Sequence, residues 1–174
     1  MEKSGNLTIQ SQEAQVNTGN IKTEAPEGSS GRIVINGTEV GTGDLRSIGT
    51  TSAGEINVEA TDGSIKTYDI EITSDGTIEG LRLRATEDII TRDINQTAGE
   101  GDANINIESG ENQTTGDINQ TAGNDANINQ TAGEDLSTGD INQTFGNESI
   151  NIQKDGVNQK TDSTSVISNN NSIL

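Results

Sequence analysis

The sequence of 174 residues predicts an all-β fold: a parallel β-solenoid (β-helix) of about six coils, with about 24 residues and three short strands per coil and no helices. The first observation is a phrase, Ile-Asn-Gln-Thr, that returns at Ile94, Ile118 and Ile141, at spacings of 24 and 23 residues. The second is that β-branched Ile, Val and Thr are abundant and Gly is frequent. The third is that no stretch shows the ~3.6-residue period of an amphipathic helix.

Apolar residues occupy fixed positions in the repeat over almost the whole chain. Counting in both directions from Ile94 gives a column made only of Ile and Leu: Ile21, Leu45, Ile70, Ile94, Ile118 and Ile141. Five residues before each lies a second column with one polar exception: Val16, Val40, Ile65, Ile89, Gln113 and Leu136. Half a repeat later come pairs two residues apart: Leu7/Ile9, Ile33/Ile35, Ile56/Val58, Leu81/Leu83, Ile105/Ile107, Ile128/Gln130 and Ile150/Ile152. A spacing of two is that of one strand face, so we expect these positions to face the interior.

Gly, Asn, Asp and Ser cluster between the alternating segments, and these residues make tight corners. Each short segment is expected to pair with its equivalent above and below, ~4.8 Å away. The composition alone is also typical of a disordered chain, and the periodicity is what favours a fold. We expect the solenoid to span residues 1–162 and residues 163–174 to form a polar tail, either a cap or an inter-subunit contact.

The charge and composition exclude several function classes. The chain carries ten Lys and Arg against 28 Asp and Glu, a formal net charge of −18, so nucleic acid is not an expected partner. It has no Cys and no His, which excludes disulfides, thiolate or imidazole metal sites and His-dependent catalysis. We expect no enzyme activity. No apolar run approaches the ~18 residues of a membrane span, so no membrane insertion is expected.

Two columns of polar residues are expected to stabilise the stack. Gln96, Gln120 and Gln143 follow the Ile column by two residues, and stacked amides can hydrogen-bond along the axis. Three residues before the Ile column, every position is Thr, which predicts an inward hydroxyl ladder or a corner cap. These residues are Thr18, Thr42, Thr67, Thr91, Thr115 and Thr138.

A column of acidic residues directly precedes the Ile column and leaves two interpretations open. Each carboxylate either satisfies its own corner by a local hydrogen bond or contributes to a row of Ca²⁺ sites between coils. No other cofactor is expected. The residues are Asp44, Asp69, Asp93, Asp117 and Asp140.

Asn95, Asn119 and Asn142 each begin an Asn-Gln-Thr sequon and are expected to face outward in a line. They are either sites of N-glycosylation or simply part of a polar β-surface.

Part of the chain resembles the curlin repeats of bacterial curli fibres. The resemblance is carried by Ile118-Asn119-Gln120, Gly123-Asn124, Ala126, Ile128 and Gln130, and more loosely by Ile141, Gln143, Gly146-Asn147, Ile152 and Gln153. It covers mainly residues 94–153. Curlins are secreted, amyloid-like subunits of biofilm fibres, so the resemblance implies a secreted fibre subunit.

Together these patterns predict a structural subunit that polymerises with itself, head to tail, into an extracellular or cell-surface filament. A β-helical adhesin or phage-fibre binding module is an alternative, and a bactofilin-like cytoskeletal polymer is another. The first residues show no signal-peptide core, so a cytoplasmic location stays open.

Overall fold

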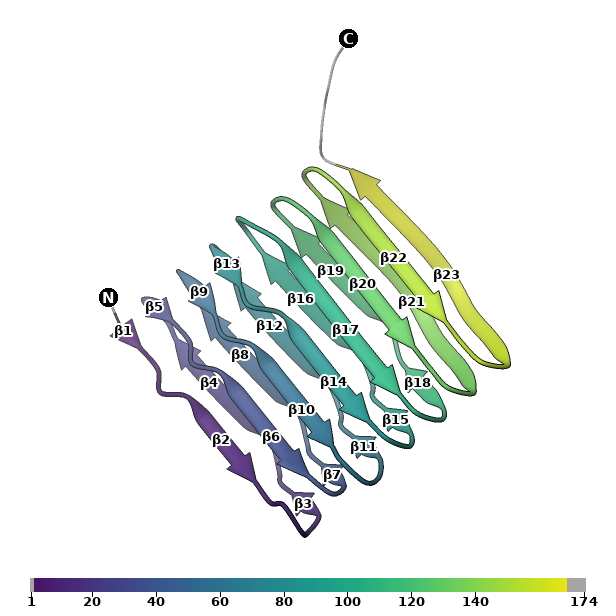
Figure 1. The fold of residues 1–174 in the computed structure, drawn as a ribbon. Coiled ribbons are helices and arrows are strands. Elements are labelled where there is room, and N and C mark those ends of the chain that lie inside the picture. The colour runs from purple at the N-terminus through teal and green to yellow at the C-terminus, as the bar shows by residue number, and fades with distance from the viewer. Residues whose placement is uncertain (1, 169–174) are drawn as a thin grey trace.

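The computed structural model describes residues 2–168, and within them every regular element is a strand. The chain winds into a β-solenoid of about seven turns with about 24 residues per turn, which confirms the predicted fold class. Figure 1 shows the coils stacked in one row, with the N-terminal coil at one end and the C-terminal coil at the other. The described residues contain no helix that could span a membrane.

Two sheets run the length of the stack and a short one covers only its N-terminal coils, and the strand pairs within all three are parallel. One long face is a seven-stranded sheet, in spatial order β2 (Leu7–Gln10), β6 (Ile33–Gly37), β10 (Ile56–Ala60), β14 (Leu81–Ala85), β17 (Ala103–Ser109), β20 (Ala126–Thr131) and β22 (Ser149–Lys154). A short sheet at one corner contains β1 (Glu2–Lys3), β5 (Gly28–Ser29), β9 (Ser52–Ala53) and β13 (Thr77–Ile78).

The third sheet has twelve strands and includes the second long face. One arm of it contains β3 (Val16–Asn17), β7 (Val40–Gly41), β11 (Ile65–Lys66), β15 (Ile89–Ile90) and β18 (Gln113–Thr115). The other arm contains β4 (Ile21–Ala25), β8 (Leu45–Gly49), β12 (Ile70–Ser74), β16 (Ile94–Ala98) and β19 (Ile118–Ala122). Both arms end on β21 (Asp135–Phe145), which in turn pairs with β23 (Asn158–Ser168).

The expectation of three strands per coil holds in the middle of the stack, where β14–β16 and β17–β19 make one coil each. Earlier coils have a fourth short strand, such as β13, and the last coils have only two. The difference at the C-terminal end arises because β21 continues around a corner that separates β18 from β19 in the coil below. The structure has about seven turns where about six were expected, and the segment that begins at Leu7 stacks on β6 as the first of them.

The predicted columns are the core of the solenoid. Ile70, Ile94, Ile118 and Ile141 lie directly over one another and are almost completely buried. Their neighbours from the seven-stranded sheet, such as Ile33 and Ile56, pack in the same continuous cluster. Inward and outward residues alternate along each long strand, as the pleat requires.

The interior changes character along the rod. In the column that contains Ile72, the residues of the next three coils are Gln96, Gln120 and Gln143. Likewise Ile107 is followed by Gln130. All these side chains are buried, so amides replace isoleucines in these columns toward the C-terminal coils. In the first two coils the Ile72 column holds the buried hydroxyls of Thr23 and Ser47.

The prediction that Ile150 and Ile152 face inward was wrong. Strand β22 pairs with β20 so that both isoleucines lie above outward Asn residues, and they are 50% and 43% exposed. The observed register places Gln153 over Gln130, with Gln153 Nε2 donating to Gln130 Oε1 at 2.9 Å. A shift by one residue in either direction would instead bring Lys154 or Glu148 to an inward position, at the cost of burying a charge.

The boundary expected at residue 162 does not coincide with the end of an element. Strand β23 runs through it and pairs with β21 as far as Ser168. Residues 163–168 therefore belong to the last coil, and residues 169–174 of the expected tail lie outside the described residues.

The register of β22 predicts opposite outcomes for two similar substitutions. Ile152→Asn should leave the free energy of unfolding unchanged within about 0.5 kcal/mol, because the side chain lies outward above Asn129. Ile105→Asn should lower it by about 2 to 4 kcal/mol, because it buries an amide between Leu81 and Ile128. Urea unfolding followed by circular dichroism measures both, and equal losses would contradict the register.

Candidate functional site: polar ladders and charged faces

The Gln column forms an axial ladder in the interior, as the sequence predicts. Gln120 Nε2 donates to Gln96 Oε1 at 2.9 Å, and Gln143 Nε2 donates to Gln120 Oε1 at 3.0 Å. The same amides reach across the interior to backbone carbonyls of the opposite sheet, with Gln120 Nε2 at 2.7 Å from Ala103 O and Gln143 Nε2 at 3.0 Å from Ala126 O. Each side chain is about 1% exposed, so these bonds replace the water that burial removes.

Sequence analysis missed a second amide ladder in the opposite sheet. Gln153 donates to Gln130, and Gln130 Nε2 lies 3.2 Å from Thr138 Oγ1. Gln159 Nε2 and Thr161 Oγ1 donate to Gln153 Oε1 at 2.7 and 2.9 Å. Gln130 and Gln153 are 23 residues apart, one repeat, and this spacing could have predicted the ladder. The expectation that Ile152 faces inward put the neighbouring Gln153 outward, so the ladder was not predicted.

The Thr column lies at one corner, and its members are buried except for the half-buried Thr18. In the N-terminal coils, as far as Thr91, each hydroxyl donates to the carbonyl of the following residue, for example Thr42 to Gly43 at 3.0 Å and Thr91 to Arg92 at 2.9 Å. The same bond is made by Thr18 and Thr67. Of the two interpretations left open, this geometry matches the corner cap.

In the C-terminal coils, from Thr115 onward, the Thr hydroxyls contact the side-chain amides of Gln residues. Thr115 Oγ1 accepts from Gln113 Nε2 at 3.4 Å, and Thr138 lies beside Gln130. Thr161 stacks above Thr138 and extends the column by one coil, which sequence analysis did not include.

The Asp column also caps a corner, by bonds between coils. Asp93 Oδ1 accepts from the backbone N–H of Asp117 at 3.0 Å, and Asp117 Oδ1 accepts from the backbone N–H of Asp140 at 2.9 Å. Asp44 donates its N–H to Asn20 Oδ1 at 2.9 Å in the same way, and Asp69 lies at the equivalent corner between them.

Between residues 2 and 168, no three or more His, Cys, Asp or Glu side chains are grouped so that they could hold a metal ion. The carboxylates of Asp93 and Asp117 bond to the backbone of the next coil, whereas the local interpretation expected a bond within their own corner.

The sequon asparagines form an outward ladder on β16, β19 and β21. Asn119 Nδ2 donates to Asn95 Oδ1 at 3.1 Å, and Asn142 Nδ2 donates to Asn119 Oδ1 at 3.1 Å. The amide nitrogens that would carry a glycan are thus engaged in two of the three residues, and strands ~4.8 Å apart leave little room for neighbouring glycans. This arrangement matches the polar β-surface interpretation.

Charge is unevenly distributed along the rod. Residues 93–153 contain eleven Asp and Glu and no Lys or Arg, so the coils that carry the amide ladders are uniformly acidic. In the last coil Lys154 and Lys160 balance Asp155 and Asp162. The first coil, residues 2–25, has two Lys against three Glu.

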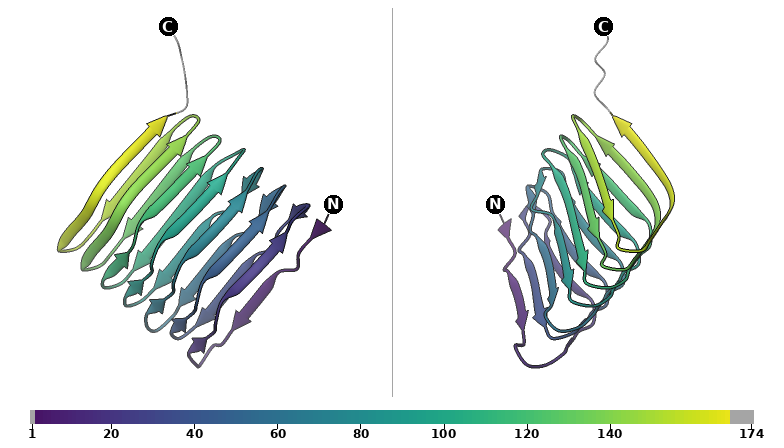
Figure 2. Two further views of the ribbon diagram at one scale, coloured as in Figure 1. Left: turned by 180° about the vertical axis from the view of Figure 1, so that it is seen from behind. Right: turned by 45° about the vertical axis from the view of Figure 1, so that its right-hand side comes forward.

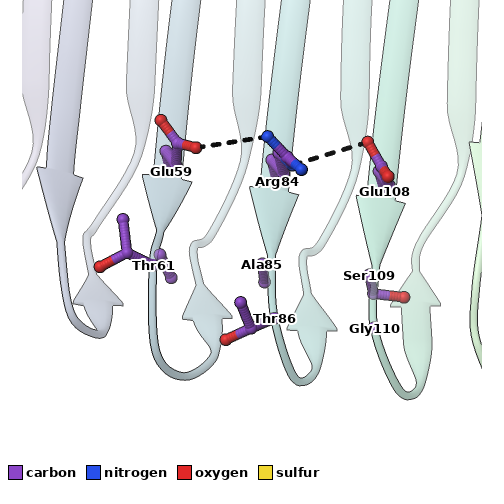
Figure 3. Close-up of a pocket in the computed structure, with 9 residues that line it drawn as sticks. Glu59, Thr61, Arg84, Ala85, Thr86, Glu108, Ser109 and Gly110 are labelled. Carbon is purple, nitrogen blue, oxygen red and sulfur yellow. Dashed lines mark ion pairs between the residues drawn. The ribbon is translucent and has the colours of Figure 1, made fainter.

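In the N-terminal coils, before residue 93, Arg side chains form ion pairs with acidic side chains of neighbouring coils. Arg84 lies between Glu59 and Glu108, at 3.7 Å from each, beside a shallow depression of the surface (Figure 3). Arg32 contacts both Glu55 and Glu79, and the hydrogen bond with Glu55, followed by the charges of Glu55 and Glu79, raises the pKa of Arg32. Apart from Glu55, which is 20% exposed, these side chains are roughly 40 to 60% exposed, so each pair contributes little to stability but offsets repulsion within its column.

The geometry therefore offers ladders, edges and charged faces, rather than a cleft with convergent catalytic groups in the described part of the chain. Comparison with family models, with curated proteins and with solved structures finds no match to this chain.

Two Gln→Leu substitutions should change stability in opposite directions. Gln120→Leu should lower the free energy of unfolding by about 2 to 4 kcal/mol, because it leaves buried partners in Gln96, Gln143 and the opposite sheet without their bonds. Gln113→Leu should raise it by about 1 kcal/mol, because Gln113 Oε1 is buried without a hydrogen-bond partner between Ile89 and Leu136. Urea unfolding of the two variants decides, and a loss of stability in Gln113→Leu would contradict the account.

Proposed function

We propose that this chain is a structural subunit of a β-solenoid filament at the cell surface or in the extracellular space, assembled end to end by strand pairing between copies. The observation that carries the proposal is that both ends of the described stack expose strands paired on one side only. At one end β2, β3 and β4 pair only with β6, β7 and β8. At the other end β22 pairs only with β20, and β23 only with β21 (Figure 2).

Unpaired strand edges are templates for further strands, and monomeric proteins usually cover them. Another coil placed on either end would add a row of backbone hydrogen bonds, each contributing about 1 kcal/mol net. Within residues 2–168 no helix or crossing loop covers either edge.

The charge distribution supports contacts at the ends rather than along the sides. The acidic coils of residues 93–153 would repel one another if two rods lay side by side. The first and last coils are close to neutral, so repulsion between copies is least where the edges lie.

The stacked amides support a filament that is amyloid-like, in the sense that identical side chains stack along its axis. Identical Gln and Asn side chains, in register at the spacing of strands, are the arrangement found in cross-β fibrils. Here they occur both in the interior, at Gln96 to Gln143, and on the outer faces, as in the pairs Asn104–Asn127 and Asn106–Asn129.

Purified protein should form long, unbranched rods one solenoid wide at low ionic strength. Raising the salt from about 0.01 M to about 1 M shortens the Debye length from ~30 Å to ~3 Å, and should let the rods associate into bundles. Negative-stain electron microscopy and light scattering measure both effects. Short single rods at every protein concentration would contradict the filament.

A substitution on the edge strand gives the matched test. Because Leu7 N–H points to Arg32 O, the alternate N–H of Thr8 points away from β6, toward the free edge. Thr8→Pro removes that donor and should shorten the rods strongly, whereas Thr8→Val should assemble like the parent chain. Both variants should keep the same circular dichroism spectrum, since Thr8 is exposed and its side chain lies outside the core.

A further inference from the structure

The two ends of the stack present different chemistry to a neighbouring copy. At the N-terminal end most inward side chains are apolar: Leu7, Ile9, Val16 and Ile21 all pack in the main core cluster, and the buried hydroxyl of Thr23 already donates to Gly31 O. At the C-terminal end the inward side chains are mostly amides and hydroxyls. They are identified by their pairing with buried residues of the coil below: Ser149, Asn151, Gln153, Gln159, Thr161, Thr164 and Ser168, with Val166 above Gln143 as the apolar exception.

A head-to-tail junction that continued the columns would bring these unlike ends together. Leu7 and Ile9 would cover Asn151 and Gln153, because they occupy the same two columns of the seven-stranded sheet. Amides would then be covered by side chains that can neither donate nor accept a hydrogen bond. Asn151 Oδ1 is already enclosed without a partner at this end, and an apolar cover would remove its access to one.

The twelve-stranded sheet gives the same mismatch in two columns, and in a third Thr23 would cover Val166. Val16 would cover Gln159, and Ile21 would cover Thr164. A shift of one residue does not resolve it, because Thr8 and Gln10 would then enter the interior in place of Leu7 and Ile9.

A junction between like ends removes the mismatch. A two-fold axis across the rod places the apolar N-terminal coil of one copy against the same coil of a second copy, and the polar C-terminal coils against each other. The rotation makes strands antiparallel across the junction, and antiparallel pairing is at least as stable as the parallel pairing within the chain. Each junction is isologous, and two different isologous junctions in alternation build an open filament.

We propose, resting on the filament proposed above, that like ends meet: copies join N-terminal coil to N-terminal coil through Leu7, Ile9, Val16 and Ile21, and C-terminal coil to C-terminal coil through their amides and hydroxyls. The occupant of each end is a second copy of this chain. The resulting filament has no overall direction.

Cysteine cross-linking tests the proposal directly, because the chain has no Cys of its own. Thr8→Cys places a thiol on the outward face of the first coil, and Ile152→Cys places one on the same face of the last coil, in the column of Thr8. Thr97→Cys, exposed on the central strand β16, is the matched control. The reagent is a short flexible bis-maleimide that cannot span the seven coils of one chain, about 34 Å at ~4.8 Å per coil.

Each end variant alone should give covalent dimers, and the central control should give few. In a mixture of Thr8→Cys with Ile152→Cys chains of different tag mass, homodimers should exceed heterodimers by roughly tenfold. Heterodimers in excess, with no homodimers in the single-variant samples, would establish head-to-tail junctions and overturn the proposal while leaving the filament intact. Gln10→Cys and Lys154→Cys, which share a second outward column of the same sheet, repeat the test, and circular dichroism verifies the fold of every variant.

Two further outcomes overturn both proposals. Sedimentation of uncross-linked protein as a monomer at all concentrations would exclude the filament and its junctions together. Cross-linking of Thr97→Cys as strong as that of the end variants would indicate side-by-side association instead.

Discussion

Every strand of this molecule depends on contact with its own equivalent one coil away. The long strands contain only four to eleven residues, and the corner strands only two or three, so none would be stable alone. The fold therefore requires that like residues recur at the length of a coil. Once that condition is met, one coil presents the next with a matching edge of backbone groups and matching side chains. Small differences in corner length then leave the columns in register.

The recurrence also allows the interior to be polar. A single buried glutamine is costly, but a column of them satisfies itself, because each amide has both a donor for the coil below and an acceptor for the coil above. The amides of Gln120 and Gln143 also tie the two long faces together through backbone carbonyls. Gln113 shows the converse: its neighbours in the column are Ile89 and Leu136, and one of its polar atoms has no partner.

Much of this arrangement could be predicted from the sequence, since a period of 23 to 24 residues places side chains in columns without any knowledge of the fold. The Ile and Gln columns and the outward line of Asn95 follow from it directly. The prediction was wrong at Ile150 and Ile152, where apolar spacing competes with the pairing of Gln153 over Gln130 and with the cost of burying Lys154 or Glu148. Periodicity counts residues, but it does not compare the energies of neighbouring registers.

Spacing gives positions but not hydrogen-bond directions. The Thr hydroxyls of the N-terminal coils donate within their own corner, whereas the Asp carboxylates accept from the next coil, although both columns have the same period. The choice depends on which backbone groups each corner leaves free, and that is a property of the folded backbone. The second amide ladder depends in the same way on the register of the last coil.

The shared phrase of β16, β19 and β21 has a consequence for the length of the rod. Ile94, Ile118 and Ile141 begin the same Ile-Asn-Gln-Thr phrase and lie directly over one another. A coil inserted or deleted here would therefore meet neighbours that match it along these strands. A chain with one coil more or fewer would form a rod longer or shorter by ~4.8 Å, with the same terminal surfaces.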